Sequence, residues 1–186
     1  YNNTSTTNTL NTAIGHGALN VSTVGVENTF IGANACDNGV LVGSYNTSVG
    51  AYSTRNLTSG EGNTAMGRSA FSSATTGGTN TAIGYLALNS ATTSSNNVAI
   101  GAAALQLNTT GGSNVGIGKD AGQSITTGGS NVAIGPQALD STTTANYNTA
   151  VGKQALTDNT TGASNTAVGY ASLANNTTAA NNVAVG

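Results

Sequence analysis

Few side chains in this sequence could carry out chemistry, and they do not form a recognisable catalytic or metal-binding pattern. The 186 residues include one histidine, His16, and one cysteine, Cys36. A metal centre or a nucleophilic triad needs several such side chains together. His16 follows a motif glycine, as Arg68, Lys119 and Lys153 do elsewhere, so we expect a solvated turn residue. Cys36 occupies a position where other repeats carry leucine, which predicts a buried packing thiol rather than a nucleophile.

The carboxylates do not recur at one position of the repeat described below. This argues against a calcium-binding solenoid with a column of aspartates. Paired acid–base catalysis needs two carboxylates held at a fixed separation in a cleft, and nothing in the spacing provides this. We expect Lys119 and Asp120 to share an exposed corner. The sequence therefore predicts no enzyme activity, no cofactor, and no catalytic, cofactor-binding or metal-binding residues among the six carboxylates, which are Glu27, Asp37, Glu61, Asp120, Asp140 and Asp158.

Three other kinds of motif have a simpler interpretation than a site. Glycine pairs such as Gly111-Gly112 and Gly128-Gly129 lack the following Lys-Ser/Thr and helix start of a phosphate loop, so we interpret them as corners. Tyrosines at variable turns could stack on sugars: Tyr85, Tyr147 and Tyr170. Triplets of the form Asn-x-Ser/Thr could accept glycans, although a chain this rich in Asn and Thr generates them by composition; they begin at Asn20, Asn46, Asn56, Asn108, Asn159 and Asn176.

Paired threonines suggest a separate hypothesis, that of an ice-binding face. Flat arrays of regularly spaced threonine resemble the ice-binding faces of antifreeze solenoids, which usually separate the two threonines by one residue. Adjacent residues of a strand point to opposite sides, so only one threonine of each pair can face outward here. The pairs recur every 17 residues at Thr92-Thr93, Thr109-Thr110, Thr126-Thr127, Thr143-Thr144, Thr160-Thr161 and Thr177-Thr178.

The composition is not that of an ordinary globular domain. Only 5% of the residues are charged, against about 25% in a typical soluble domain, and the net charge is -2. No basic stripe is available for nucleic acid or anionic lipid, and no apolar run approaches the roughly 20 residues of a membrane span. We therefore expect neither nucleic acid nor a membrane as a partner of this segment. The chain starts and stops within repeats, so we expect a piece of a longer polypeptide.

A short motif recurs along the whole chain. It reads Asn, Thr or Val, a small residue, Ile, Val or Met, and Gly, as in NTAIG ending at Gly15 and NVAVG ending at Gly186. Four of the regular repeats continue with two variable residues and Ala-Leu, at Ala87-Leu88, Ala104-Leu105, Ala138-Leu139 and Ala155-Leu156. The closing glycine returns in eight consecutive steps of 17 residues at Gly50, Gly67, Gly84, Gly101, Gly118, Gly135, Gly152, Gly169 and Gly186.

The first fifty residues follow the same pattern with variable spacing. Their closing glycines lie 10, 7, 11 and 7 residues apart, at Gly15, Gly25, Gly32, Gly43 and Gly50. The regular period likewise divides into 10 plus 7, which predicts two strand endings per turn. We divide the chain into residues 1–50, irregular coils, and residues 51–186, regular 17-residue coils, within one continuous rod.

A five-residue unit of this kind suits a strand and is too short for a helix. Strands that recur at a fixed period stack in register, about 4.8 Å apart, and form ladders of equivalent side chains. The sequence therefore predicts an all-β fold, a parallel β-solenoid or β-roll of 17-residue coils. We expect Thr12 and Ile14 to face the core, with leucine at the next corner, an asparagine ladder at the strand entrance and freely turning glycine at the strand exit.

The same alternation predicts a strand face of small residues on the outside, with Ala13, Ala65, Ala82 and Ala99 among them. A flat alanine face beside a thin core favours close packing of several chains, and a trimer is our preferred arrangement. The alternative is a monomeric solenoid in which alanine fits a tight corner.

These units resemble two families of surface proteins. NTAIG and NVAIG, with glycine endings seven apart in VSTVG–ENTFIG and GVLVG–NTSVG, are similar to the head repeats of trimeric autotransporter adhesins (YadA-like), which form trimers of left-handed parallel β-rolls. The 17-residue forms NTAIGYLALNSATTSSN and NTAVGKQALTDNTTGAS resemble the arrays of phage tail-fibre and tail fiber domain-containing proteins. The resemblance implies a left-handed homotrimer. The three-residue insertion per coil departs from the adhesin pattern.

We therefore expect a structural fibre shaft or stalk of an extracellular, cell-surface or virion-surface appendage. Such a shaft projects a binding tip for host or surface attachment, with a host or cell-surface glycan as a candidate ligand of the unseen tip. One alternative is an adhesin that binds glycans or surfaces through its own repeat corners, and another is the ice-binding solenoid. Whether the segment polymerises into a filament is left open.

Overall fold

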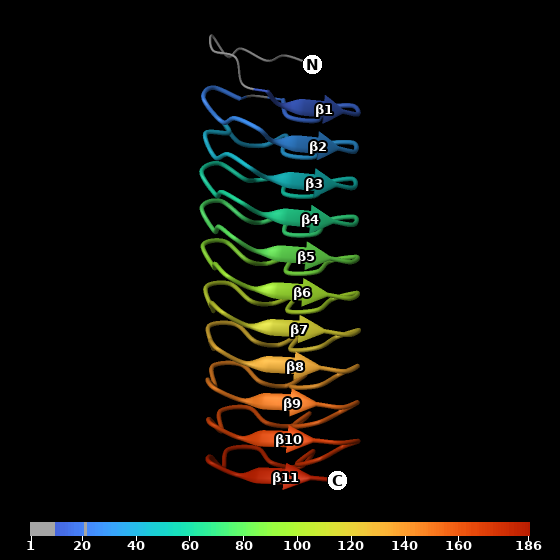
Figure 1. The fold of residues 1–186 in the computed structure, drawn as a ribbon, viewed down its shortest axis with the longest axis vertical. Coiled ribbons are helices and arrows are strands. Elements are labelled where there is room, and N and C mark those ends of the chain that lie inside the picture. Colours follow the sequence, from blue (N-terminus) through green and yellow to red (C-terminus); the bar gives the residue numbers. More distant parts are fainter. Residues whose placement is uncertain (1–9, 21) are drawn as a thin grey trace.

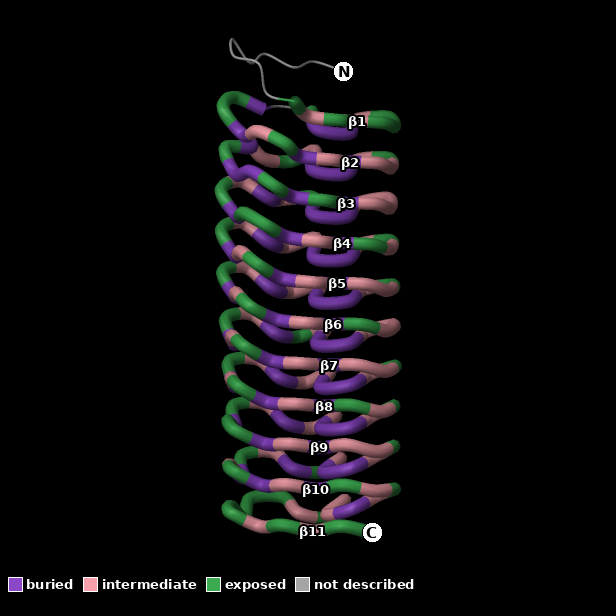
Figure 2. The backbone as a smooth tube through the Cα atoms, viewed as in Figure 1, coloured by how far each residue is buried: buried purple, intermediate pink, exposed green. Residues whose placement is uncertain are grey.

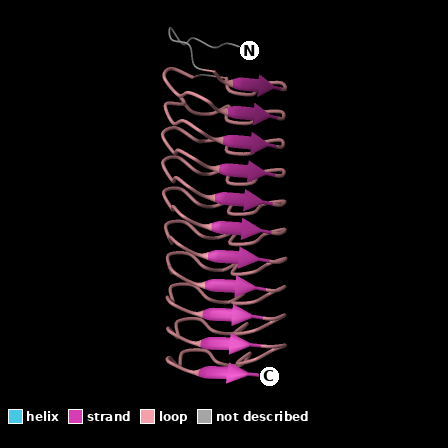
Figure 3. Cartoon of the chain, viewed as in Figure 1, coloured by secondary structure: helices cyan, strands magenta, loops and turns pink. Residues whose placement is uncertain are grey.

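The chain forms a straight stack of strands. The computed structural model describes residues 10–20 and 22–186, so residues 1–9 and 21 of the first predicted segment lie outside the described part. Eleven strands of three residues form one parallel sheet in sequence order (Figures 1 and 3). The described residues contain no helix. The strands are β1 (Thr12–Ile14), β2 (Thr29–Ile31), β3 (Thr47–Val49), β4 (Thr64–Met66), β5 (Thr81–Ile83), β6 (Val98–Ile100), β7 (Val115–Ile117), β8 (Val132–Ile134), β9 (Thr149–Val151), β10 (Thr166–Val168) and β11 (Val183–Val185).

Equivalent residues of successive repeats lie directly over one another. Ile83 pairs with Ile100 in the sheet, as the 17-residue period predicts. The step between paired residues is 17 everywhere except between β2 and β3, where Thr29 pairs with Thr47. Ten steps of roughly 4.8 Å make a rod about 48 Å long. The parallel β-solenoid with coils of about 17 residues is thereby confirmed.

The prediction of two strand endings per turn is wrong for the described residues. Each coil carries one strand, and the other half of the coil adds only an isolated bridge between Ser22 and Leu41. The backbone before the second glycine turns instead of extending. The N–H groups of Thr58, Ser59 and Gly60 all donate to the carbonyl oxygen of Thr75, at 3.0, 3.1 and 3.3 Å. Because three donors converge on one acceptor, no ladder of one bond per residue can form there.

The two faces of each strand are the reverse of those predicted. The central alanines Ala65, Ala82 and Ala99 are fully buried, whereas Ile100 and Ile134 are 37% exposed. In Figure 2 the strands are drawn largely in the colours of partly buried and exposed residues, and the segment of chain behind them is drawn largely in the colour of buried residues. The interior is tightly packed at the strand centre of β7, where a Cβ added to Gly116 would lie 2.8 Å from Cγ of Leu105, whereas β2 accommodates the fully buried Phe30 at the same position.

The core lies between the strand centres and the chain that returns behind them. It contains the alanine and leucine of the Ala-Leu pair, as in Ala87-Leu88 and Ala104-Leu105, all fully buried. Leucine at the corner was therefore correctly predicted to be internal. These leucines adopt left-handed backbone, with φ of 51° at Leu88 and 50° at Leu105. A bulky residue rarely does so, and burial of its side chain, which contributes about 2 kcal/mol, offsets the strain.

Candidate functional site: the ladders and faces of the rod

A continuous asparagine ladder runs along the strand entrance, as predicted. In the middle of the rod the backbone N–H of Asn114 donates to Oδ1 of Asn97 at 2.9 Å, and the N–H of Asn131 donates to Oδ1 of Asn114 at 3.0 Å. The side-chain amide of Asn114 donates to the carbonyl of Gly128 at 2.8 Å. Each asparagine thus links its own coil to the two neighbouring coils. The ladder comprises Asn11, Asn28, Asn46, Asn63, Asn80, Asn97, Asn114, Asn131, Asn148, Asn165 and Asn182.

The closing glycines form a second column, at the strand exit. Gly118 has φ of 128°, and a Cβ there would lie 2.8 Å from the carbonyl carbon of Gly135. Both the backbone conformation and the close approach of the next coil therefore require glycine at this position. The predicted conformational freedom of glycine at the strand exit is confirmed.

The threonine pairs divide as predicted, with one member of each turned outward. The first threonine is partly buried in the central coils, and its hydroxyl donates to a carbonyl one coil further on, as Thr109 does to Thr126 at 3.1 Å and Thr126 does to Thr143 at 3.1 Å. The second threonine is exposed, as at Thr110 and Thr127. The first column therefore ties coils together, and the second presents one row of hydroxyl groups to solvent.

The outward face of the sheet is an apolar strip two side chains wide. Its first column carries Thr or Val, and its second carries Ile, Val or Met. Val98 and Ile100 on β6 are typical, since the first is half-buried and the second is 37% exposed. Sequence analysis placed these side chains inside. Phe30 was the signal that could have corrected it, because it occupies the alanine position and phenylalanine is among the residues most often fully buried.

The corner after the strand carries three of the four basic residues. Arg68 lies over the ring of Tyr85 with its Cζ 5.9 Å from the ring centre, and Nζ of Lys153 is at the same distance from the ring of Tyr170. Both tyrosines are exposed. The third basic residue, Lys119, pairs with Asp120 at 2.6 Å, so the predicted exposed corner shared by these two residues is confirmed for the lysine, whose side chain is 73% exposed. His16 is exposed on the same corner, as predicted.

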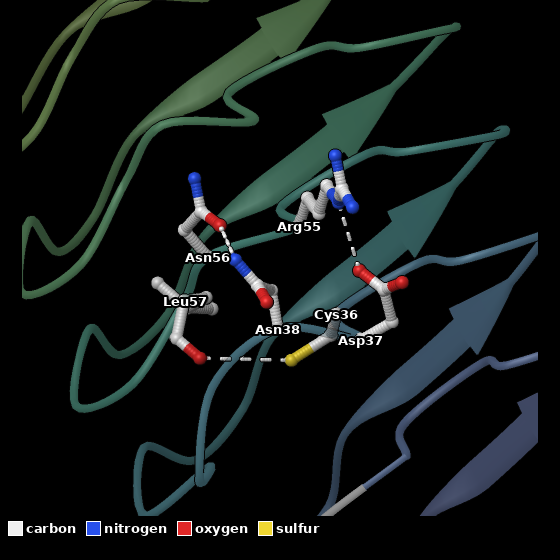
Figure 4. A network of polar contacts seen from close by, with 6 residues as sticks. All are labelled: Cys36, Asp37, Asn38, Arg55, Asn56 and Leu57. Atoms are coloured by element: carbon white, nitrogen blue, oxygen red, sulfur yellow. Dashed lines mark hydrogen bonds and ion pairs between the residues drawn. The ribbon is translucent and has the colours of Figure 1, made fainter.

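Cys36 is the buried packing thiol that its position predicts. It is fully buried, and burial, with a smaller contribution from Asp37, raises the pKa of the thiol to about 12. Its Sγ donates a weak hydrogen bond to the carbonyl of Leu57 at 3.7 Å. Figure 4 shows this contact beside the ion pair between Asp37 and Arg55, whose Nε is 3.1 Å from Oδ1 of the carboxylate. The thiol therefore stays protonated at neutral pH.

The carboxyl group of Asp140 lies in surroundings that disfavour its charged form. Burial, together with the charge of Asp120, raises the pKa of Asp140, while Lys119 opposes the shift. Oδ1 of Asp140 is buried without a hydrogen-bond partner within the chain. The nearby Asp120 oxygens are shared with Lys119 and, at 3.5 Å, with Gln123. This arrangement destabilises the charged form of Asp140 without creating an acid–base pair.

The glycan-acceptor triplets are unevenly accessible. Asn46, Asn108 and Asn159 are fully buried, so the folded chain cannot accept a glycan at these three positions. Asn20 is exposed, and Asn56 and Asn176 are partly exposed.

Sites for metals, membranes and small molecules have little support in the described part of the chain. Residues 10–20 and 22–186 contain no group of three or more His, Cys, Asp and Glu side chains placed to hold a metal. No helix in those ranges is long and apolar enough to span a bilayer. A half-open hollow of about 470 Å³ near the start of the rod is lined in part by His16 and Asp37, and the carboxylate of Asp37 already pairs with Arg55.

Comparison with known proteins gives no relative. No family model matches the chain, and no curated protein or solved structure matches it significantly.

Proposed function

We propose that this segment is the shaft of a fibre on an extracellular, cell or virion surface, in which it holds a binding tip away from that surface. The observation that carries the proposal is the unbroken stack of coils, in which every coil is tied to the next along its whole circumference. Strand bonds, the asparagine ladder and the threonine hydroxyls all repeat at one-coil intervals. Such a stack has no hinge in the described residues, and stiffness is the property that a spacer requires.

The low charge suits the same role. Two of the four basic residues are already paired within the chain, and long-range forces between exposed charges are screened within about 8 Å at physiological ionic strength. The rod is held together mainly by short hydrogen bonds and by packing of small apolar residues. Its rigidity is therefore insensitive to salt.

We further propose that the shaft is a homotrimer in which the outward strip of each sheet faces a common axis. The strip is roughly 7 Å wide and 48 Å long, and its Ile, Val and Met side chains remain exposed in a single chain, as at Met66, Ile134 and Val168. Soluble monomers rarely expose an apolar patch of several hundred Å² without a partner. The expectation of a trimer thus remains, but it now depends on this strip instead of an outward alanine face.

The test uses the segment alone. A shaft appears in electron micrographs as straight rods of constant width, and it leaves nothing bound on glycan arrays or on cells. Flexible or collapsed particles would refute the proposal of a shaft.

A second candidate function is adhesion by the rod itself. It is favoured by the exposed tyrosines Tyr85 and Tyr170, each with a basic side chain over its ring. Specific retention on a glycan array, lost in a variant with both tyrosines changed to alanine, would support adhesion over a pure spacer role.

The third candidate, ice binding, is favoured by the exposed threonine row that includes Thr110 and Thr127. Measurable thermal hysteresis, abolished by replacing those threonines with lysine, would support it, whereas a shaft is expected to show none.

A further inference from the structure

The two edges of the sheet carry different side chains. The corner after each strand is the exit edge, and the two residues before each ladder asparagine form the entrance edge. Among the described residues, two of the four basic side chains lack a carboxylate partner, namely Arg68 and Lys153, and both lie on the exit edge. The other two, Arg55 and Lys119, are paired within the chain.

The entrance edge is mostly small and uncharged, with Gly, Ala, Ser, Thr or Asn before β5 to β8, β10 and β11. Charged or aromatic residues interrupt it before four strands, at Glu27 (β2), Tyr45 (β3), Glu61 (β4) and Tyr147 (β9). Tyr147 is notable because it is 69% exposed and has left-handed backbone, with φ of 61°. The equivalent residues in the adjoining coils are Ser130 and Ser164, so nothing in the fold requires a bulky side chain there.

The two cations without a carboxylate partner lie at the same height along the rod as two of the charged or aromatic entrance residues. Glu61 precedes β4 and Arg68 follows it, while Tyr147 precedes β9 and Lys153 follows it. Lys119 follows β7, which is preceded by Gly112 and Ser113, and this lysine is already neutralised by Asp120. The two cations without a carboxylate partner in the chain, Arg68 and Lys153, are therefore those whose own strand begins beside a glutamate or a tyrosine.

These matched residues cannot meet within one chain. Glu61 and Arg68 lie at opposite ends of the same strand, on the order of 20 Å apart for seven residues of extended backbone. In a closed ring of copies whose strips face a common axis, the exit edge of each copy adjoins the entrance edge of the next. Rotation without translation keeps equivalent coils at equal height. The ring thus places Arg68 beside Glu61 of the next copy, and Lys153 beside Tyr147 of the next copy.

A shaft needs residues that fix the axial alignment of its chains, because the apolar strip alone does not favour one alignment over another. The strip repeats every coil, so sliding one copy by one coil preserves most of its packing, and register in such a sheet is weakly specified. Sliding by one coil moves each charge by roughly 4.8 Å relative to its partner. Zero offset is the only alignment at which both Arg68 and Lys153 face one of the four entrance residues, because every other offset leaves at least one of them opposite small uncharged residues or beyond the described strands.

We propose that Arg68 with Glu61 of the next copy, and Lys153 with the ring of Tyr147 of the next copy, fix the axial register of the assembled shaft. The inference rests on the proposed oligomeric shaft and adds the residues that align its chains. Glutamate with arginine forms a charge-assisted pair, and a lysine ammonium is attracted to the face of a tyrosine ring.

Cross-linking tests the proposed edge contact directly. A variant carrying Glu61→Cys and Arg68→Cys, treated with a short bismaleimide, should give covalent multimers on a denaturing gel. The register control carries Glu61→Cys and Lys119→Cys, whose cysteines would lie three coils apart in height, roughly 14 Å, and should remain monomeric. The native Cys36 is buried and protonated, so it does not compete. Equal cross-linking in both variants, or none in the first, would overturn the inference.

Charge reversal gives an independent test that needs no cross-linking reagent. Glu61→Arg or Arg68→Glu alone should weaken association at least about tenfold, because like charges then adjoin across the interface, and the double reversal should largely restore it. The matched control reverses Lys119 and Asp120, which pair within one chain, and should leave association unchanged. A wild-type chain that stays monomeric refutes the oligomeric shaft itself. An oligomer indifferent to all the reversals refutes only the assignment of register.

Discussion

Replacing Asn114 with alanine should be one of the most damaging single changes in the rod. The side chain of Asn114 accepts the backbone N–H of Asn131 at 3.0 Å and donates to the carbonyl of Gly128 at 2.8 Å, both in buried surroundings. Alanine leaves those two backbone groups without partners and out of reach of water. Each buried unsatisfied group costs about 1–3 kcal/mol, so the expected loss is about 2–6 kcal/mol.

The assay is urea unfolding followed by circular dichroism at a fixed protein concentration, since an oligomer's stability depends on concentration. Thr127→Ala is the matched control, because Thr127 lies in the same stretch of the rod and is exposed. It should change stability by less than about 0.5 kcal/mol. Hydrogen exchange should also quicken at the amide of Asn131 in the Asn114→Ala variant. If Asn114→Ala unfolds within about 0.5 kcal/mol of the control, the ladder does not hold the coils together.

Three further changes test other parts of the structure. Gly118→Ala should destabilise the rod by about 2 kcal/mol or more, because φ is 128° and its Cβ would lie 2.8 Å from the carbonyl carbon of Gly135. Gly112→Ala should cost less, because its φ lies outside the left-handed range and its one close neighbour would be the carbonyl oxygen of Ser95 at 3.2 Å; equal melting temperatures of the two variants would contradict this. Asp140→Asn should raise the melting temperature at pH 7 and leave it unchanged at pH 3. The reason is that the folded-state pKa of Asp140 is raised, so its contribution to stability is intact below the unfolded pKa and is lost as pH rises through the folded one; a fall at pH 7 would refute that sign. Cys36, with a pKa of about 12, should resist a thiol reagent at pH 8 until the chain is unfolded, and rapid labelling of the folded protein would show that it is accessible.

The spacing of glycine and asparagine was sufficient to predict the stack. Glycine at the strand exit adopts a positive φ that disfavours other residues, and asparagine at the strand entrance joins neighbouring coils through its amide. Both residue types are therefore required once per coil, and they recur every 17 residues in the sequence. The parallel register, with Ile83 over Ile100, follows from that period alone.

The orientation of the strands could not be obtained in the same way. Alternation shows which residues share a face, and a three-residue strand does not reveal which face is inside. We assigned Thr12 and Ile14 to the core, but the strand centres face the leucine column inside, and Thr12 and Ile14 are exposed. Left-handed backbone at Leu88 and Leu105 was equally unpredictable, because burial of the side chain outweighs the local preference.

The second predicted strand failed for a related reason. The glycine at Gly60 marks a turn in which successive N–H groups converge on the carbonyl of Thr75. A glycine ending is compatible with a strand exit and with such a turn, and spacing alone does not distinguish them.

Sedimentation equilibrium of the wild-type chain is the most direct test of whether the apolar strip is covered by further copies in a shaft. The expected result is one species at three times the chain mass of 18.0 kDa, which dissociates when Val115 and Ile117 are both changed to lysine while the strand signal is retained. A wild-type chain that sediments as a folded monomer across the accessible concentration range would contradict it.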